Sequence, residues 1–183
     1  MTVISDHYRR VSAQFTARVQ AVPAAAWENP APCEGWVARD VVRHLVDWLP
    51  DYFFDRWGIA HPAGPSVDDD PVGGWAAVDG AIQSALDDPE VATRVADTRF
   101  GPASFEQQID MICTSDVFLH TWDLARAAGL DETLDPDEVH TMLEGIEPND
   151  EALRSSGHYG PRVPVPDDAD EQTRLIAFIG RQP

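Results

Sequence analysis

The chain has 183 residues, and 43% of them are hydrophobic, which is enough to bury one substantial core. Acidic residues outnumber basic ones by 32 to 13, which gives a formal net charge of −19. Because such a surface repels nucleic-acid phosphates and anionic lipid headgroups, we expect neither as a partner. Every basic residue is arginine, which excludes a Schiff-base lysine and the lysine of a phosphate-binding P-loop.

Apolar residues recur at every third or fourth position in the first part of the chain, which is the spacing of a helix with one buried face. The first series ends before Pro23 and predicts a helix to about residue 21; its members are Ile4, Tyr8, Val11, Phe15, Val19 and Val22. A second series predicts a helix that begins near Val37 and reaches Leu49. Pro50 should kink or restart this helix, because proline removes a backbone donor and clashes with the preceding turn.

The middle of the chain combines an aromatic run with a polar loop. The run from Trp48 to Trp57 is more typical of a buried core than of a pocket wall, although either interpretation fits its spacing. Segment 61–74 is rich in Pro, Gly and Asp and predicts an exposed loop. Apolar residues then predict a third helix over about residues 75–86, and we expect residues 88–103 to be a connector.

The strongest helical periodicity lies in about residues 104–128 and stops at Gly129, a common helix terminator. A short helix is expected at about 136–146, and a last apolar stretch lies at 175–179. No segment shows the alternating pattern of a strand over any length. These features predict an all-α protein with one domain over residues 1–183.

We expect the helical bundle to span about residues 3–129 and a C-terminal extension to span about residues 130–183. The N-terminus, MTVISDHYRR, has no basic segment followed by an apolar run, and no stretch of about 18 apolar residues occurs, so we expect a cytoplasmic protein. In a reducing cytosol the two cysteines, Cys33 and Cys113, are expected to be free thiols.

Polar residues interrupt the apolar faces of two predicted helices. Asp116 and His120 are four positions apart, so both side chains project from one helix face and can bind one ion. A buried carboxylate needs a compensating partner, which a cation supplies. His44 has a similar inward position in the helix that begins near Val37. If these helices are neighbours, the three side chains form a metal site with open positions for water or substrate.

Each candidate also has a simpler interpretation. A core histidine is usually only hydrogen-bonded, and an Asp–His pair one turn apart often forms an intrahelical hydrogen bond. Cys113 is either a fourth ligand or a small buried hydrophobic residue. Asp123 either orients the His120 ring or caps another element. The other histidines are expected at the surface: His7, His61, His140 and His158.

Three segments are distinctive: VARDVVRHLVDW, DVFLHTWDLARAAG and the closing GPRVPVPDDADEQTRLIAFIGRQP. They resemble an actinobacterial family of DinB-like metal-binding proteins related to the N-terminal domain of mycothiol-dependent maleylpyruvate isomerase. The resemblance implies a four-helix up-down-down-up bundle with short additional C-terminal helices. It also implies a divalent metal, typically zinc with nickel or manganese as alternatives, held by His44, Asp116 and His120. The related isomerase has Glu at the position of Asp116, so the carboxylate here is one methylene shorter.

The resemblance further implies mycothiol, the low-molecular-weight thiol of actinobacteria, because bound zinc lowers the pKa of a thiol. We expect a mycothiol-dependent transferase or isomerase in which the metal-bound thiolate attacks a small electrophile between the helices. No side chain stands out as a catalytic base. The alternatives are a hydrolase that uses metal-bound hydroxide, a non-catalytic metal- or ligand-binding protein, and a structural domain with a buried hydrogen-bond network. Bundles of this type often form homodimers.

Overall fold

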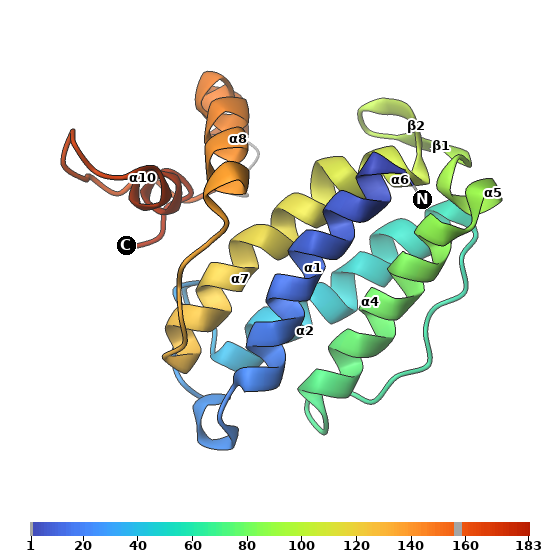
Figure 1. The fold of residues 1–183 in the computed structure, drawn as a ribbon, viewed down its shortest axis with the longest axis horizontal. Coiled ribbons are helices and arrows are strands. Elements are labelled where there is room, and N and C mark those ends of the chain that lie inside the picture. Colours follow the sequence, from blue (N-terminus) through green and yellow to red (C-terminus); the bar gives the residue numbers. More distant parts are fainter. Residues whose placement is uncertain (1, 156–158) are drawn as a thin grey trace. The chain divides into compact units, whose positions relative to one another are not determined.

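Helices make up most of the regular structure in the computed structural model, which describes residues 2–155 and 159–183 (Figure 1). The chain divides into two compact units, Met1–Asp131 and Glu132–Pro183. The expectation of an all-α protein is confirmed in its broad form, because strands contribute only one two-stranded sheet within the described residues. No helix in this part of the chain is long and apolar enough to cross a membrane.

Four long helices build the described part of the first unit. Their bounds are Val3–Ala21 for α1, Ala38–Leu49 for α2, Pro71–Asp87 for α4 and Ser115–Ala128 for α7. Both α1 and α2 contact α4 and α7, so the four helices enclose a common core. Figure 1 shows α1 and α7 running in one direction and α2 and α4 in the other. The apolar series of the first helix lines this core, where Tyr8, Phe15 and Val19 are buried.

Local sequence sets where two of these helices begin or end. The Asp70 side chain accepts a hydrogen bond from the backbone N–H of Gly73 at 2.8 Å, and Pro71 occupies the first turn of α4, where its missing N–H costs little. As a result α4 begins inside segment 61–74, the end of which is helix rather than the predicted loop. Helix α7 ends at Gly129, which adopts the left-handed conformation with φ of 67°.

The chain widens into a π-helical turn at Pro50. From α2 it continues directly into this turn, η2, Pro50–Phe54, and then into α3, Asp55–Trp57. A π-turn shifts the hydrogen bonding by one residue and so accommodates the proline ring that would clash in a regular α-helix. The helical backbone is therefore widened locally at the point where the sequence predicts a kink or a restart.

A second π-helical turn precedes Asp116. The segment runs through α6, Phe105–Gln108, the turn η3, Ile109–Thr114, and then α7. Its limits agree with the helix predicted over about residues 104–128. The Thr114 hydroxyl donates a hydrogen bond to the carbonyl of Ile109, five residues earlier, at 3.1 Å, which supports the wider turn.

The predicted connector at 88–103 contains regular structure that the sequence analysis missed. It holds α5, Pro89–Ala92, and an antiparallel hairpin of β1, Val95–Thr98, and β2, Gly101–Ser104. The expectation of no strands is therefore wrong here. Each strand has only four residues, and β1 exposes Val95 while half-burying Ala96, so no apolar alternation marks it. A turn closed by Gly101, with φ of 102°, connects the strands.

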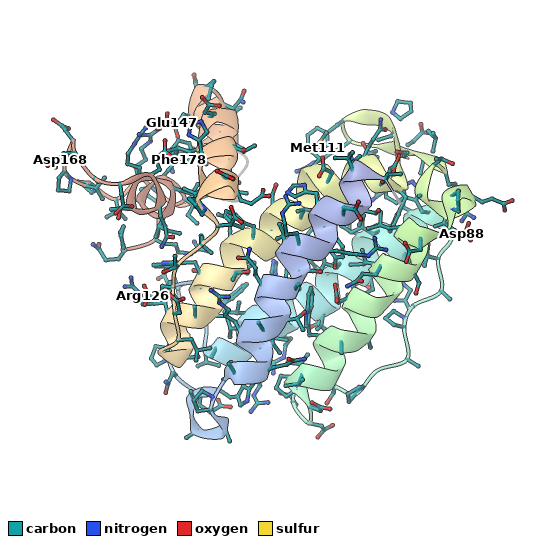
Figure 2. All side chains as sticks on the ribbon, viewed as in Figure 1. Asp88, Met111, Arg126, Glu147, Asp168 and Phe178 are labelled. Carbon is teal, nitrogen blue, oxygen red and sulfur yellow. The ribbon has the colours of Figure 1, made fainter. Side chains whose placement is uncertain are left out.

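The second unit is built from short helices. Their bounds are Pro136–Ile146 for α8, Glu147–Asn149 for the 3-10 turn η4, Asp150–Ser155 for α9 and Glu171–Phe178 for α10. Helix α8 coincides with the predicted helix and packs against α10, where Leu143, Leu175 and Phe178 are buried (Phe178 is labelled in Figure 2). Helix α9 buries none of its residues, so it lacks the apolar face by which a sequence reveals a helix.

A hydrogen bond between α1 and α4 allows a test of the core. The Tyr8 hydroxyl, which is fully buried, donates to Asp79 Oδ1 at 2.9 Å. Tyr8→Phe removes only that hydroxyl, and we expect it to lower the free energy of unfolding by about 1–2 kcal/mol in urea denaturation. Tyr52→Phe is the matched control, because its hydroxyl makes a longer 3.3 Å contact with Gln108 at a half-buried position. Equal losses for both variants would contradict this account.

Candidate metal centre

The three residues predicted to bind a metal lie together where α2 packs against α7. One ligand atom from each of His44, Asp116 and His120 lies within 4.8 Å of the other two. His44 Nε2 is 3.2 Å from Asp116 Oδ2, and His120 Nε2 is 3.5 Å from Asp116 Oδ1. Each oxygen of the Asp116 carboxylate therefore faces a different imidazole.

Helix geometry explains this convergence. Asp116 and His120 are one turn apart on α7. His44 lies on α2, which contacts α7 and is antiparallel to it (Figure 1). Both π-turns are next to the cluster in the chain, because η2 begins directly after α2 and η3 ends at Thr114, two residues before Asp116. Such turns are frequent at functional sites.

The cluster is open to solvent on one side. The side chains of His44 and Asp116 are 31% and 26% exposed, whereas that of His120 is 8% exposed. His120 is thus buried, as its predicted inward position requires, and the other two residues are half-buried. A small molecule can approach the cluster from the side of His44 and Asp116.

The distances within the cluster fit a shared metal. Two donors of one tetrahedral zinc, with bonds of about 2.0–2.1 Å, lie roughly 3.3 Å apart, whereas an N–H···O hydrogen bond has an N···O distance of about 2.9–3.0 Å. Asp116 lies 3.2 Å from His44 and 3.5 Å from His120, and both distances are close to the spacing of two zinc donors. Two imidazole nitrogens and a carboxylate oxygen are also a donor set that zinc and similar divalent ions accept.

Asp116 is held in its charged form. Burial alone would raise its pKa, but the charge of His120 and hydrogen bonds from His44 and from Trp48 Nε1, the latter at 3.0 Å, lower the pKa below its ordinary value. The carboxylate is therefore ionised at neutral pH, as a metal ligand must be.

His120 carries a proton in the metal-free protein. Burial alone would lower its pKa, but the Asp116 carboxylate, together with a hydrogen bond to Asp123, raises the pKa to about 10. A metal that binds His120 at neutral pH must therefore displace a proton.

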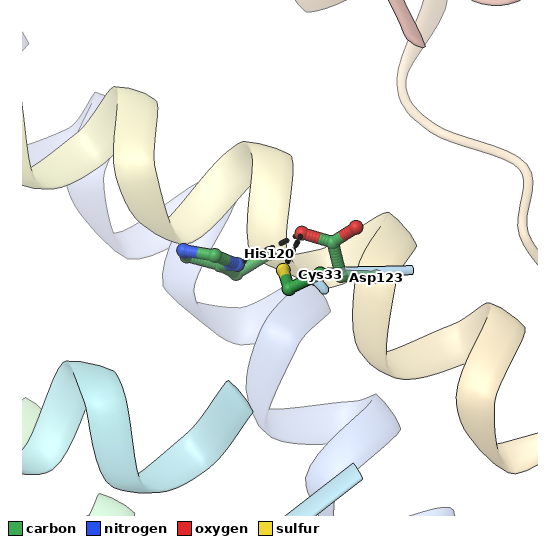
Figure 3. Close-up of side chains that lie close together, drawn as sticks. All are labelled: Cys33, His120 and Asp123. Atoms are coloured by element: carbon green, nitrogen blue, oxygen red, sulfur yellow. Dashed lines mark hydrogen bonds and ion pairs between the residues drawn. The ribbon is translucent and has the colours of Figure 1, made fainter. Parts of the chain in front are cut away.

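Cys33, His120 and Asp123 form a second group of side chains (Figure 3). This group lies at Nδ1 of the His120 ring, whereas Asp116 faces Nε2. Asp123 Oδ2 is 2.9 Å from His120 Nδ1 and 3.4 Å from Cys33 Sγ. Of the two roles considered for Asp123, the structure supports orientation of the His120 ring. Cys113 is buried but belongs to neither group within the described residues, and burial raises the pKa of its thiol.

Sequence reasoning did not single out Trp36 as part of the site. Its ring stacks on His120 with centroids 5.8 Å apart and lies 5.1 Å from His44. Trp36 and Cys33 both belong to the Pro- and Gly-containing segment before α2, where no helical periodicity indicates which way a side chain points. The only available signal was that this segment leads directly into the helix that carries His44.

The aromatic run divides between the core and the site. Phe53, Phe54 and Trp57 are buried, as the core interpretation predicts. Trp48 and Tyr52 are half-buried, and Trp48 donates its hydrogen bond to Asp116, so this part of the run belongs to the surroundings of the cluster.

Three of the remaining histidines pair with carboxylates away from the cluster. His61 and His140 are exposed, as predicted, and contact Asp55 at 2.9 Å and Glu171 at 3.0 Å. His7 is half-buried rather than exposed, because its Nδ1 lies 2.7 Å from Asp110 Oδ1. His158 lies outside the described residues.

The fold and the cluster define a helical protein with a partly exposed His–Asp–His group whose donor atoms lie close enough together to hold a divalent cation. Residues 8–53 match the family described as the mycothiol maleylpyruvate isomerase N-terminal domain. This match confirms the predicted resemblance over a segment that runs from α1 through α2 and includes His44.

The whole chain also has relatives. Two uncharacterised proteins, one from each of two strains of Mycobacterium tuberculosis, are both 26% identical to it over 180 residues, which is 95% of this chain and 95% of each relative. No solved structure matches the chain.

The protonation of His120 predicts how the stability of the metal-free protein depends on pH. Because folding raises the pKa from an ordinary value of about 6.5 to about 10, the charged ring stabilises the fold fully below about pH 6.5, and this contribution is lost as the pH rises to about 10. With a chelator present, urea denaturation should show wild-type stability falling over this range. His120→Gln should flatten the decline; an unchanged slope in this variant would contradict the assignment.

Proposed function

We propose that this protein binds a divalent metal through His44, Asp116 and His120 and uses it to activate a low-molecular-weight thiol against a small electrophile. The observation that carries the proposal is the position of the Asp116 carboxylate, 3.2 and 3.5 Å from two imidazole nitrogens, on the half-exposed side of the cluster. Zinc is the first choice for this donor set, and nickel and manganese are the alternatives.

We further propose that the first unit is a DinB-like bundle with up-down-down-up topology. The opposite directions of the helix pairs and the contacts of α1 and α2 with both α4 and α7 support this assignment (Figure 1). The family match to residues 8–53 supports it independently of the helix packing. In this fold the metal ligands come from the second and the last bundle helix, which here are α2 and α7.

The ligand count favours an enzyme over a closed binding site. A structural metal site usually has four protein ligands, whereas a catalytic site has three and an open position. Cys113, the candidate fourth ligand, belongs to neither close group within the described residues. Asp123 is fully buried on the far side of the His120 ring and is engaged in a hydrogen bond. The exposed side of the cluster is therefore left for a ligand from solution.

Two tryptophans next to the cluster hold its side chains in place. Trp48 donates a hydrogen bond to Asp116 and so holds the carboxylate in place, and Trp36 packs against both imidazoles. A bound zinc would supply Lewis acidity and favour the deprotonated form of a thiol. The large negative net charge disfavours nucleic acids and anionic membranes, which leaves small molecules as the proposed partners in the cytoplasm.

Mycothiol is the proposed thiol, because the family whose model matches residues 8–53 is named for a mycothiol-dependent isomerase. The thiol group would occupy the open side of the cluster near His44 and Asp116. Transfer of the thiol to an electrophile and isomerisation of an electrophile through a thiol adduct both start from this arrangement. The protein is proposed to act as a monomer or as a homodimer.

Metal content provides the first test. Protein purified without chelator should contain about one zinc per chain, and His44→Ala and Asp116→Asn should each lower zinc affinity by more than about 100-fold, since each removes one of three ligands. Elemental analysis and competition with a chromophoric chelator measure this. His140→Ala is the matched control, because His140 is exposed and lies outside the cluster. Failure of the wild-type protein to bind added zinc would contradict the proposal.

Thiol binding is tested separately by calorimetry. Mycothiol titrated into the zinc-loaded protein should bind with release of one proton per thiol, because the metal favours the thiolate. Measurements in two buffers of different ionisation enthalpy reveal that proton. The S-methylated thiol is the control ligand, and it should bind weakly and release no proton. Equal binding of both compounds would show that the thiol does not reach the metal.

A further inference from the structure

A carboxylate and a thiol form a buried chain of contacts with His120 (Figure 3). Asp123 Oδ2 accepts a hydrogen bond from His120 Nδ1 at 2.9 Å, and the same oxygen accepts one from the Cys33 thiol at 3.4 Å. The Asp123 side chain is completely buried, and Cys33 is 8% exposed. The contact joins the loop before α2 to α7, across 90 residues of sequence.

A carboxylate in such a position must be compensated by its neighbours. Full burial of a charged group without donors costs far more than a single hydrogen bond returns. His120 supplies a charge-assisted hydrogen bond to Asp123, and Cys33 supplies a weaker one. Each donor therefore limits where the carboxylate can lie.

The two nitrogens of His120 consequently have separate roles. Nδ1 faces Asp123 at the length of an ordinary hydrogen bond, and Nε2 faces Asp116 at 3.5 Å, which is close to the spacing of two ligands on one metal. A proton kept on Nδ1 by Asp123 leaves the lone pair of the neutral ring on Nε2.

We propose that Asp123 and Cys33 are positioning residues for the metal: Asp123 fixes the tautomer and orientation of His120, and the Cys33 thiol holds Asp123 in place, so that metal affinity depends on this thiol. The inference rests on the proposed metal site at His44, Asp116 and His120. Cys33 acts through Asp123 and is not itself a ligand. The 2.9 Å contact between His120 and Asp123 is too short for two donors of one tetrahedral metal, and it closes the Nδ1 side of the ring.

The size of each effect follows from its distance to the metal. Loss of the partner of a metal-binding histidine typically weakens metal binding by about 10- to 100-fold, and we expect this for Asp123→Asn. Cys33→Ala removes the next contact in the chain and should weaken zinc binding by about 3- to 10-fold. Cys33→Ser keeps a donor of similar size and should stay within about twofold of wild type.

Zinc affinity of the full chain, measured by competition with a chromophoric chelator, tests this order. Cys113→Ala is the matched control, because Cys113 is also a buried thiol of the first unit but lies in neither cluster. Its affinity should equal that of wild type. Urea denaturation of each metal-free variant separates a general loss of stability from a loss of metal affinity, since Cys113→Ala should also destabilise the fold.

A spectroscopic measurement on the zinc-loaded wild type needs no variant. Nitrogen-15 NMR of the histidine rings should show His120 with a proton on Nδ1 and the metal on Nε2. Wild-type zinc affinity in both Asp123→Asn and Cys33→Ala would overturn the inference while leaving the proposed metal site intact. Metal on Nδ1 would place the ion on the side of Asp123 and Cys33 and would overturn both the inference and the proposed site. Wild-type and Cys113→Ala protein that both fail to bind zinc would overturn the proposed function and this inference together.

Discussion

The interaction on which the site depends is the contact of one carboxylate with two imidazoles between α2 and α7. Asp116 lies on a partly buried face of α7, where an uncompensated charge would destabilise the packing of the two helices. His44 and His120 provide that compensation, and Trp48 adds a hydrogen bond from α2. The same contacts that make the carboxylate tolerable in the fold also arrange three donors around a space that suits a metal ion.

The solvent exposure of the side chains decreases from the outside to the inside of the site. His44 and Asp116 remain partly exposed, His120 is nearly covered, and Asp123 is fully buried behind it. A ligand from solution therefore meets the proposed metal-binding face first, while Asp123, which contacts His120 from behind, is protected from solvent. Such an arrangement holds the first ligands rigidly and keeps one side free, and this combination distinguishes a catalytic metal site from a structural one.

Sequence alone could predict the helices that carry a periodic signal and the three candidate residues that interrupt it. Asp116 and His120 stood out because polar residues at a spacing of four interrupt an apolar series, and His44 did so for the same reason. Cys33 and Trp36 could not be placed, because they lie in an irregular loop whose side-chain directions depend on tertiary contacts.

The departures in the fold have similar causes. Four-residue strands without apolar alternation, such as Val95–Thr98, leave no pattern to detect, and the response of a helix to Pro50 depends on whether the surrounding packing permits a π-turn. The sequence therefore did not predict the contacts of segments that lack a repeating buried face.

In the proposed site two histidines and one carboxylate bind the metal, and no sulfur does. X-ray absorption spectroscopy at the zinc edge of the zinc-loaded protein, free of added thiol, tests it most directly. The account predicts only nitrogen and oxygen neighbours at about 2.0–2.1 Å, with the outer-shell scattering of two imidazole rings. A sulfur neighbour at about 2.3 Å would place Cys33 or Cys113 on the metal and contradict the assignment of His44, Asp116 and His120 as the complete protein ligand set.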